Sequence, residues 1–402
     1  MDKMNQFRDI AVSRRSGHWR LIGASVAVAV AVAVAGCSPS NGGSSGGSSS
    51  DNGLSGAIDV VSIQDLSGPV GNVGIATQNG MELAEKQVND SGMLGKAKLK
   101  ISYKDTQTQQ SQAVSLMSST VSTGVTAIFG PVSSQEAVAM SPVAQSAKIP
   151  TIFTQAGSPG VLSAGDYNFR VTSPQDYYQP KMVNYLKSRG IKTVSFLYDS
   201  TVPTTKDLTE KTIPPLMKTA GITIKDMFGF QNGTTDYSAY VSKIISQNPD
   251  AVGTEGTNPE ASPVVSSLRN AGYKGLIFGG TAFGAASLAA AGSAANGVVW
   301  ATDFDPRNPF PKTQQFVKEY TAMFNTAPAN YSAEGYDAVY LLALGLQKAN
   351  STDHGKLKEA MQRVSAAGYD GALGPLKFDG NDLRQEGYLQ TIQDGVVRSA
   401  ES

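Results

Sequence analysis

Cysteine and histidine, which most often supply a nucleophile, a general base or a metal ligand, are nearly absent from this chain of 402 residues. It contains one cysteine, Cys37, and two histidines, His18 and His354. A single cysteine excludes an intrachain disulfide and a thiolate metal centre, since both need more than one thiol. Two histidines are also too few to favour a Ser-His-Asp triad or a metal site built from histidines. We therefore expect no catalytic residue, no metal and no cofactor, and no glycine loop resembles a phosphate-binding motif.

A hydrolase nevertheless remains one alternative, because serine and threonine hydroxyls are plentiful. Such an enzyme needs a base beside its nucleophile, and His354 is the candidate in the body of the chain. This histidine lies in the polar stretch STDHG, residues 351–355, between two expected helices. That setting predicts a solvated loop residue and argues against catalysis.

The charge of the chain is balanced, with 33 lysines and arginines against 33 aspartates and glutamates. No basic excess favours nucleic acid as a partner, and no acidic excess favours disorder. With 40% hydrophobic and 16% charged residues, the composition is typical of a soluble globular protein of more than one domain. We expect no nucleic-acid partner.

The N-terminus resembles the signal of a bacterial lipoprotein. Basic residues precede an uncharged, Val- and Ala-rich run over residues 21–35, which is too short to span a bilayer comfortably. The run ends in VAGC, where Cys37 would be lipidated and become the first mature residue; a membrane anchor with an incidental cysteine is the alternative. We expect a signal peptide over 1–36, and the lipidated Cys37 and a Gly/Ser linker over 37–56. These segments would tether the protein to the extracytoplasmic face of the cell membrane.

From residue 57, short β-branched runs alternate with stretches of helical periodicity, and the pattern restarts near residue 178. This alternation predicts parallel sheets covered by helices, in two doubly wound lobes with a ligand cleft beyond the strand ends. The expected strands are 58–63, 99–103, 126–129, 151–153, 194–198, 223–228, 251–253, 276–278, 297–301, 373–378 and 387–393. The expected helices are 76–90, one around 114–121, 134–148, 178–189, 208–220 with a kink or break at Pro214-Pro215, 237–247, 263–271, 311–324, 332–349 and 356–364.

A series of short motifs runs along this part of the chain. They are Gly68-Pro69-Val70, Gly80-Met81-Glu82-Leu83-Ala84, Asn89-Asp90-Ser91-Gly92, Tyr103-Lys104-Asp105-Thr106, Ile128-Phe129-Gly130-Pro131-Val132-Ser133-Ser134, Phe169-Arg170 with Asp176 and Gln179, Asn270-Ala271-Gly272, Gly335-Tyr336-Asp337-Ala338 and Gly374-Pro375-Leu376-Lys377-Phe378-Asp379. In this order over about residues 57–395, and with the lipoprotein signal, they resemble the leucine/isoleucine/valine-binding protein family. These are the type I extracytoplasmic receptors of ABC importers.

The resemblance implies an α/β fold of two doubly wound parallel-sheet lobes joined by a three-strand hinge, the type I periplasmic-binding-protein fold. Lobe one would comprise 57–172 plus 303–390, and lobe two 173–302 plus 391–402. The receptors of this family close on a small-molecule solute and dock on an ABC permease with ATPase subunits. We expect this chain to do the same as a monomer. A receptor that signals ligand occupancy to a membrane partner is the alternative, since it would use the same closure.

The resemblance also places Ser134, with Ser133 and the backbone N–H groups of a helix start, against a ligand carboxylate. Unpaired amides and the positive end of a helix favour an anion there. Ser133-x-x-Glu136 is at the same time the pattern of a capping box, which needs no ligand. The two roles can share one loop.

The family's site for a ligand ammonium group is altered in this sequence. The loop after the fourth strand contains Gln155, Ala156, Gly157 and Ser158, and Gly157 stands where a threonine is usual. In the second lobe Thr281 stands where the family has an acidic residue. A neutral threonine cannot make the charge-assisted bond that a buried ammonium requires, so an α-amino acid is a less expected ligand.

Four more residues are candidates for the cleft. Glu255 and Glu334 are carboxylates that could replace the missing one, Tyr331 stands where relatives have an aromatic wall, and Phe283 follows on the Thr281 loop. The ordinary alternatives are surface carboxylates and a tyrosine packed in the core. We expect a carboxylate-bearing solute with an apolar or aromatic body, such as an organic acid.

Overall fold

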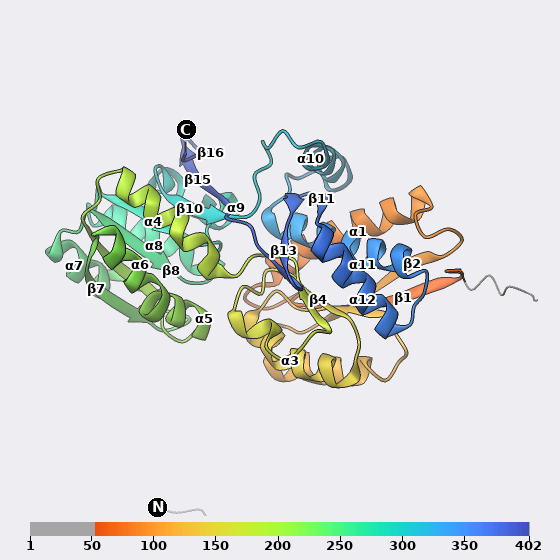
Figure 1. Cartoon of the computed structure of the whole chain (residues 1–402). Helices are drawn as coiled ribbons and strands as arrows, with labels where there is room; N and C mark the ends of the chain where they lie inside the picture. The colour runs from red at the N-terminus through yellow and green to blue at the C-terminus, as the bar shows by residue number, and fades with distance from the viewer. Residues whose placement is uncertain (1–52, 402) are drawn as a thin grey trace, which may run out of the picture. The chain divides into compact units, whose positions relative to one another are not determined.

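The computed structural model describes residues 53–401, in which Figure 1 labels the main elements. The predicted signal peptide, Cys37 and the linker up to residue 52 lie outside the described residues. The described chain contains two seven-stranded sheets and one two-stranded sheet. We call the first large sheet with its helices lobe one, on the right of Figure 1, and the second with its helices lobe two, on the left.

Lobe one has the strand order β13-β14-β5-β4-β3-β1-β2. Strands β1 to β5 are parallel, whereas β13 and β14 form an antiparallel hairpin that joins the sheet at β5. The strands are β1 (Ala57–Gln64), β2 (Lys98–Asp105), β3 (Ala127–Phe129), β4 (Thr151–Phe153), β5 (Asn168–Arg170), β13 (Phe378–Asp379) and β14 (Asp382–Leu383). The helices are α1 (Gly71–Ser91), α2 (Gln110–Thr120), α3 (Ser134–Ala147), α10 (Pro311–Phe324), α11 (Asn330–Ala349) and α12 (His354–Ala367), and the small sheet is β11 (Tyr369–Gly371) with β12 (Gly374–Leu376).

Lobe two has the strand order β16-β15-β10-β9-β8-β6-β7. Strands β6 to β10 are parallel, and β15 and β16 add two antiparallel strands at one edge. The strands are β6 (Thr193–Asp199), β7 (Thr223–Phe230), β8 (Ala251–Glu255), β9 (Leu276–Gly279), β10 (Val299–Thr302), β15 (Tyr388–Gln393) and β16 (Val396–Ser399). The helices are α4 (Gln179–Ser188), α5 (Pro203–Asp207), α6 (Ile213–Ala220), α7 (Ser238–Gln247), α8 (Asn258–Asn270) and α9 (Ala285–Leu288).

The predicted α/β fold of two doubly wound lobes is confirmed, with the difference that both sheets are mixed and mostly parallel. Strand β5 is absent from the predicted strands, because three residues are too few to show a period. At Pro214-Pro215 the chain stays helical: a π-helical turn, Leu208–Thr212, joins α5 to α6 directly before the prolines, and the backbone N–H of Ile213 donates to the carbonyl oxygen of Leu208. Prolines and π turns are both common causes of a kink in a helix.

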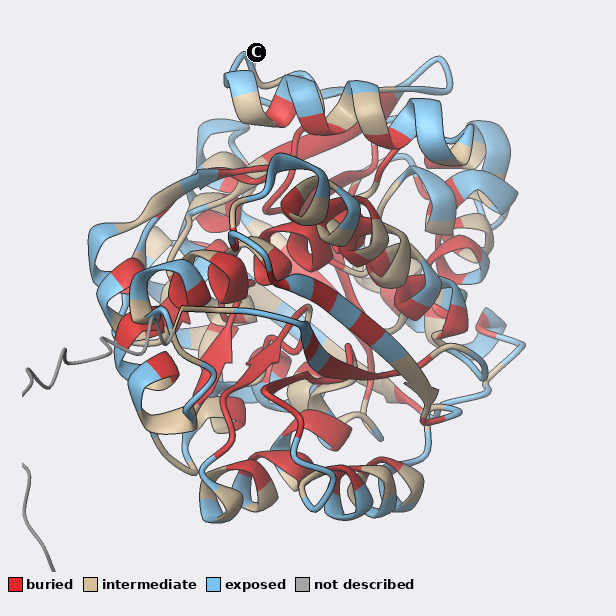
Figure 2. Ribbon diagram, turned by 90° about the vertical axis from the view of Figure 1, so that its right-hand side faces the viewer, coloured by how far each residue is buried: buried red, intermediate tan, exposed pale blue. Residues whose placement is uncertain are grey.

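Each sheet is buried between helices. Figure 2 shows buried residues along the strands and on the inner faces of the helices that cover them. Strand β3 illustrates the cause, since its sequence AIF is buried throughout, as expected of a strand covered on both faces. The core of lobe one also holds an aromatic cluster, in which Phe316 contacts Phe304, Tyr320 and Tyr336.

Within residues 53–401 the chain passes between the two sheets three times. It leaves lobe one after β5, returns after β10, and leaves again between β14 and β15. Asp303 follows β10 directly, and its Oδ2 accepts hydrogen bonds from the hydroxyls of Thr172 (3.1 Å) and Tyr178 (3.3 Å). These bonds tie the first two passages together. The residue boundaries predicted for the lobes remain a prediction.

Candidate ligand-binding site

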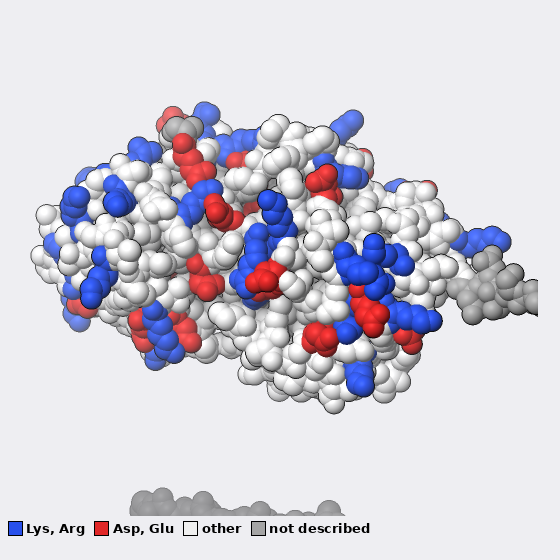
Figure 3. Space-filling model, in the orientation of Figure 1, with Lys and Arg blue, Asp and Glu red and all other residues white. Residues whose placement is uncertain are grey.

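A cavity of about 370 Å³ lies between the lobes. The segments that line it follow the carboxyl ends of parallel strands in both sheets, where ligands of such sheets bind. The lining residues are Pro69, Val70, Val73, Thr108, Val132, Ser133, Ser134, Gln135, Gln155, Gln175, Thr201, Val202, Thr204, Thr205, Asn232, Gly256, Thr257, Asn258, Thr281 and Ala282. None of these described residues is charged, whereas Figure 3 shows lysine, arginine and carboxylate side chains interspersed over the outer face in view.

Two larger hollows exist, of about 670 and 640 Å³. The first is lined by Tyr177, Lys181 and Tyr185, lies against α4 and includes no residue of the loops that follow β1 to β4 or β6 to β9. The second adjoins the cavity, since it shares Ser134 and Gln175 with it, and forms the outer groove of the same cleft. We therefore take the 370 Å³ cavity as the candidate site, although it is the smallest of the three.

The start of α3 opens into the cavity. Ser133 is the residue before the first turn, and its side chain makes no capping hydrogen bond, so the capping box that the sequence allows is not formed. Ser134 begins the helix, and its Oγ accepts a hydrogen bond from the backbone N–H of Ser158 (3.2 Å), which leaves the hydroxyl proton free to donate. The first-turn N–H groups of a helix have no partner within the helix, so an anion fits here.

Two buried carboxyl groups lie beside the loop that precedes α3. Asp65 Oδ2 accepts hydrogen bonds from the backbone N–H groups of Val132 (3.2 Å) and Ser133 (3.3 Å). Burial, followed by the charge of Asp65, raises the pKa of Glu136 to about 8. Glu136 is therefore mostly protonated at neutral pH, and the pair repels a bound anion less than two carboxylates would.

Side chains from the two lobes meet directly across the cleft. Gln155 of lobe one donates a hydrogen bond to the Thr281 hydroxyl of lobe two (3.3 Å). The Tyr331 hydroxyl of lobe one accepts a bond from the Asn258 side chain (2.8 Å) and donates one to the carbonyl of Thr281 (3.3 Å). We call the contacts of Tyr331 with Asn258 and Thr281 the Tyr331 latch. These contacts hold the lobes together around the cavity.

Two lining residues have strained backbones. Gln155 and Thr108 both have positive φ, 50° and 56°, which residues with a Cβ rarely adopt and a β-branched residue least of all. Such strain persists where the surrounding structure enforces it, and it concentrates at binding sites. Both residues lie in loops that follow strands of lobe one and line the cavity.

Glu255 ends β8, and only 7% of it is exposed. It borders a small void of about 20 Å³ that shares Gln175, Thr205, Gly256, Thr281 and Ala282 with the main cavity. Burial alone raises the pKa of Glu255 to about 8. The carboxyl group thus borders a small void next to the cavity.

Glu334 lies on α11 and is fully buried beside Asp303, away from the cavity lining. Its Oε1 accepts a hydrogen bond from the Asn330 side chain (3.2 Å). Burial and the charge of Asp303 raise the pKa of Glu334 well above its usual value, and burial raises that of Asp303 to about 6. Burial therefore favours the protonated form of Glu334, next to the second passage between the lobes.

The structure brings part of the predicted site together. Ser133, Ser134, Gln155 and Thr281 line the cavity, and Gly157 and Ser158 line the adjoining groove. The predicted residues outside the cavity lining are Ala156, Glu255, Phe283, Tyr331 and Glu334. Their roles as ligand contacts remain predictions.

Sequence reasoning missed several polar residues that line the cavity. They are Thr108, Gln175, Thr204, Thr205, Asn232, Thr257 and Asn258. Most of them lie just beyond the carboxyl end of a parallel strand, and that position is the signal by which they could have been found. The expectation that His354 is a loop residue is wrong: it begins α12, and its Nε2 lies 2.9 Å from the Val125 carbonyl oxygen, remote from the cavity lining.

In the part of the chain that the structure describes, no group of three or more His, Cys, Asp or Glu residues is arranged to hold a metal ion. Over the same residues, no helix has the length and apolar character needed to cross a membrane.

Two α/β lobes that face each other across a neutral cavity define a two-lobed solute-binding protein. Residues 57–395 match the family model described as periplasmic binding protein, and the chain belongs to that family. Its members are extracytoplasmic solute-binding proteins, not enzymes, so the predicted class of protein is confirmed.

Known relatives agree with this assignment. The Leu/Ile/Val-binding protein homolog 1 of Brucella suis is 27% identical over 330 residues, which cover 81% of this chain and 87% of that protein. The branched-chain amino acid transporter substrate-binding protein LivJ of Streptococcus pneumoniae, solved with isoleucine, is 25% identical with a TM-score of 0.78, covering 85% of this chain and 98% of that one. An ABC transporter solute-binding protein of R. palustris, solved with benzoate, is 20% identical with a TM-score of 0.78, covering 86% and 95%, and shows the same fold.

Proposed function

We propose that this protein is the extracytoplasmic substrate-binding lipoprotein of an ABC importer, which captures a small carboxylate-bearing solute by closing its two lobes. The observation that carries the proposal is the uncharged cavity of about 370 Å³ at the strand ends of both lobes, into which the start of α3 opens. Its size suits a small ligand. Curated relatives named as Leu/Ile/Val-binding proteins, which match over most of this chain, support it.

The lining favours a solute with one acidic end and an apolar body. The carboxylate would accept hydrogen bonds from the Ser134 hydroxyl and from first-turn N–H groups of α3. Val73, Val132 and Val202 offer apolar surface to the remainder of the solute. Aliphatic and aromatic organic acids have this character, and the isoleucine and benzoate bound by two proteins of the same fold share it.

Closure would couple solute binding to transport. A solute that contacts both lobes favours the closed form only by its difference in affinity for the closed and open forms. The closed receptor would present surfaces of both lobes to an ABC permease, and the ATPase subunits of that importer would supply the energy. Lipidation of Cys37, proposed from the sequence, would keep the receptor at the membrane surface.

Titration calorimetry with paired ligands tests this proposal. We expect the purified protein to bind at least one of benzoate, 3-phenylpropanoate and 4-methylpentanoate, and not the corresponding primary amide. Ser134→Ala is expected to weaken binding about ten-fold, since it removes one hydrogen bond to a charged group. Ser118→Ala, an exposed serine on α2, is the control. Equal binding of acid and amide, or no effect of Ser134→Ala, would contradict the proposal.

A further inference from the structure

Arg170 is a buried cation near the candidate site that does not itself line the cavity. It ends β5, and only 1% of it is exposed. Its Nε and Nη2 donate hydrogen bonds to Oδ1 and Oδ2 of Asp382, at 2.7 and 2.8 Å, and two such bonds fix the plane of a guanidinium group. A buried cation is costly unless it is paired and its donors are satisfied, so the partners of its other donors matter.

The other donors of Arg170 hold the loop that follows β4. Nη1 donates hydrogen bonds to the carbonyl oxygens of Ala156 (3.1 Å) and Ser158 (2.7 Å). The carbonyl oxygen between them, that of Gly157, accepts a hydrogen bond from the backbone N–H of Gln175 (3.1 Å), which lies in the first passage between the lobes. Three successive carbonyl groups are therefore fixed, and the loop is tied to the hinge.

The same loop orients the hydroxyl group of Ser134. The backbone N–H of Ser158 donates to Ser134 Oγ (3.2 Å), and Ser134 lines the cavity at the start of α3. This bond occupies a lone pair of the oxygen, so the hydroxyl proton is available to a carboxylate in the cavity. A chain of contacts thus runs from Asp382 through Arg170 and Ser158 to Ser134.

We propose that Arg170 is a positioning residue for the solute carboxylate: it fixes Ser158, and through Ser158 the hydroxyl group of Ser134 that donates to the carboxylate. This inference rests on the proposed function, in which Ser134 binds the solute. Arg170 ends β5, the last strand before the first passage, and Asp382 lies in β14, the last strand before the third. The ion pair therefore joins two of the three passages where they leave lobe one, and it links the carboxylate site to the hinge.

A lysine cannot reproduce these contacts. The guanidinium group reaches a carboxylate and two carbonyl oxygens at once, whereas an ammonium group is a single point donor on a flexible stem. Arg170→Lys keeps the positive charge opposite Asp382, so no buried carboxylate is left unpaired. This variant is therefore expected to fold and to release Ser158.

A double-mutant cycle between Arg170→Lys and Ser134→Ala tests the inference. Titration calorimetry measures the affinity for benzoate, 3-phenylpropanoate and 4-methylpentanoate. For each acid that the unmodified protein binds, we expect Arg170→Lys alone to weaken binding about ten-fold, as Ser134→Ala does, since either change removes an oriented hydroxyl group. In the Ser134→Ala background, Arg170→Lys is expected to weaken binding less than about two-fold, because no hydroxyl group is left to orient.

Asp382→Asn is a second variant, which keeps Arg170 and removes the charge that fixes its guanidinium group. It is expected to show the same coupling to Ser134→Ala with a smaller loss of affinity, about three-fold, and it decides the test should Arg170→Lys fail to fold.

Arg269→Lys is the matched control. Arg269 Nη1 also donates to two carbonyl oxygens, those of Tyr273 (3.0 Å) and Gly275 (2.8 Å), but it lies at the end of α8 that is remote from the cavity lining. We expect Arg269→Lys to lower the thermal unfolding midpoint and to leave the affinity unchanged.

The outcomes separate the inference from the proposed function. Equal losses of affinity in the two backgrounds would show that Arg170 supports the fold without positioning Ser134, and the inference would be overturned. An unchanged affinity in both Arg170→Lys and Asp382→Asn would overturn it as well. In either case the proposed function stands if the acids bind and Ser134→Ala weakens them. If the unmodified protein binds none of the three acids, the proposed function fails, and the inference with it.

Discussion

At the scale of single residues, Tyr331 has a role that its sequence position did not suggest. The sequence predicts that it forms an aromatic wall against the solute. In the structure its ring lies outside the cavity lining and packs against Val73 and Val132, which do line the cavity. Its hydroxyl forms the latch to Asn258 and Thr281 of lobe two. Tyr331 therefore packs against residues of the cavity lining and, through its hydroxyl, holds the two lobes together.

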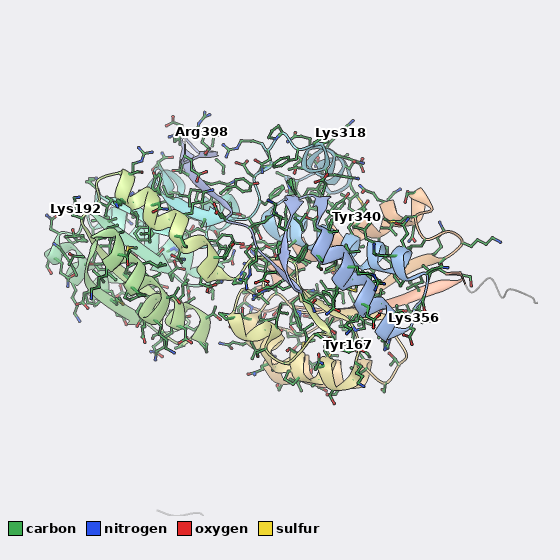
Figure 4. All side chains as sticks on the ribbon, viewed as in Figure 1. Tyr167, Lys192, Lys318, Tyr340, Lys356 and Arg398 are labelled. Carbon is green, nitrogen blue, oxygen red and sulfur yellow. The ribbon has the colours of Figure 1, made fainter. Side chains whose placement is uncertain are left out.

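We expect Tyr331→Phe to weaken solute binding roughly five- to ten-fold, because two hydrogen bonds that exist only in the closed form are lost while the cavity keeps its lining. Titration calorimetry measures the affinity, and X-ray scattering should show the fraction of closed protein falling at a fixed solute concentration. Tyr340→Phe is the control: Figure 4 labels Tyr340 on the same helix, and its hydroxyl donates to Gln87 within lobe one (2.9 Å). An unchanged affinity in Tyr331→Phe would exclude the latch.

At the scale of elements, the close packing of α1 and α11 depends on two glycines. A Cβ on Gly80 would lie 1.9 Å from the backbone oxygen of Ser332, and one on Gly335 would lie 2.4 Å from that of Thr77. Backbone atoms cannot move aside as the end of a side chain can, so the helices would have to separate. These helices position the start of α1 and the residues of α11 that face the hinge and cleft.

Gly80→Ala is therefore expected to destabilise the protein by about 2 kcal/mol or more, even though alanine is the better helix former. Urea unfolding of the purified protein measures this change. Gly284→Ala, in lobe two, is the matched control, because nothing lies within 4 Å of its added Cβ and its φ is extended. Equal stability of the two variants would show that α1 and α11 separate at no cost.

At the scale of the whole molecule, carboxyl groups are buried in both lobes. Burial raises the pKa of Glu136 and Glu255 to about 8, that of Glu260 and Asp337 to about 7, and that of Asp303 to about 6. The acids whose pKa is lowered, such as Asp166 and Asp250, lie near the surface. The described part of the chain therefore binds more protons when folded than when unfolded across the neutral range.

This distribution sets the sign of the pH dependence. An acid with a raised pKa in the folded state contributes its full stability below its unfolded pKa, and that stability is lost as the pH rises towards the folded value. We expect the unfolding midpoint of the solute-free protein to fall by roughly 5 °C or more between pH 5 and pH 8, as thermal denaturation can measure. Glu255→Gln should make this slope shallower, whereas Glu359→Gln, an exposed acid, should not. A midpoint that is constant or rises over this range would contradict the expected burial.

The elements of the fold were largely predictable because they are specified by short-range patterns. Helix α10 was predicted with the bounds that the structure has, and α11 differs by two residues at its start, since a long amphipathic period locates a helix well. The hairpin of β13 and β14 was not anticipated. Its two-residue strands have no period of their own and are held by pairing with β5, more than two hundred residues earlier in the chain.

The sequence by itself determined the alternation of strands and helices, the scarcity of catalytic residue types, and the position of Ser134 at a helix start. These follow from residue types and spacings within one turn or one strand. Only the tertiary structure decided that Glu255 lies beside the cavity without a partner, that Glu334 faces Asp303, and that Tyr331 joins the lobes. Which side chains meet across a cleft depends on strand order and on the passages between lobes, and neither is encoded in neighbouring residues.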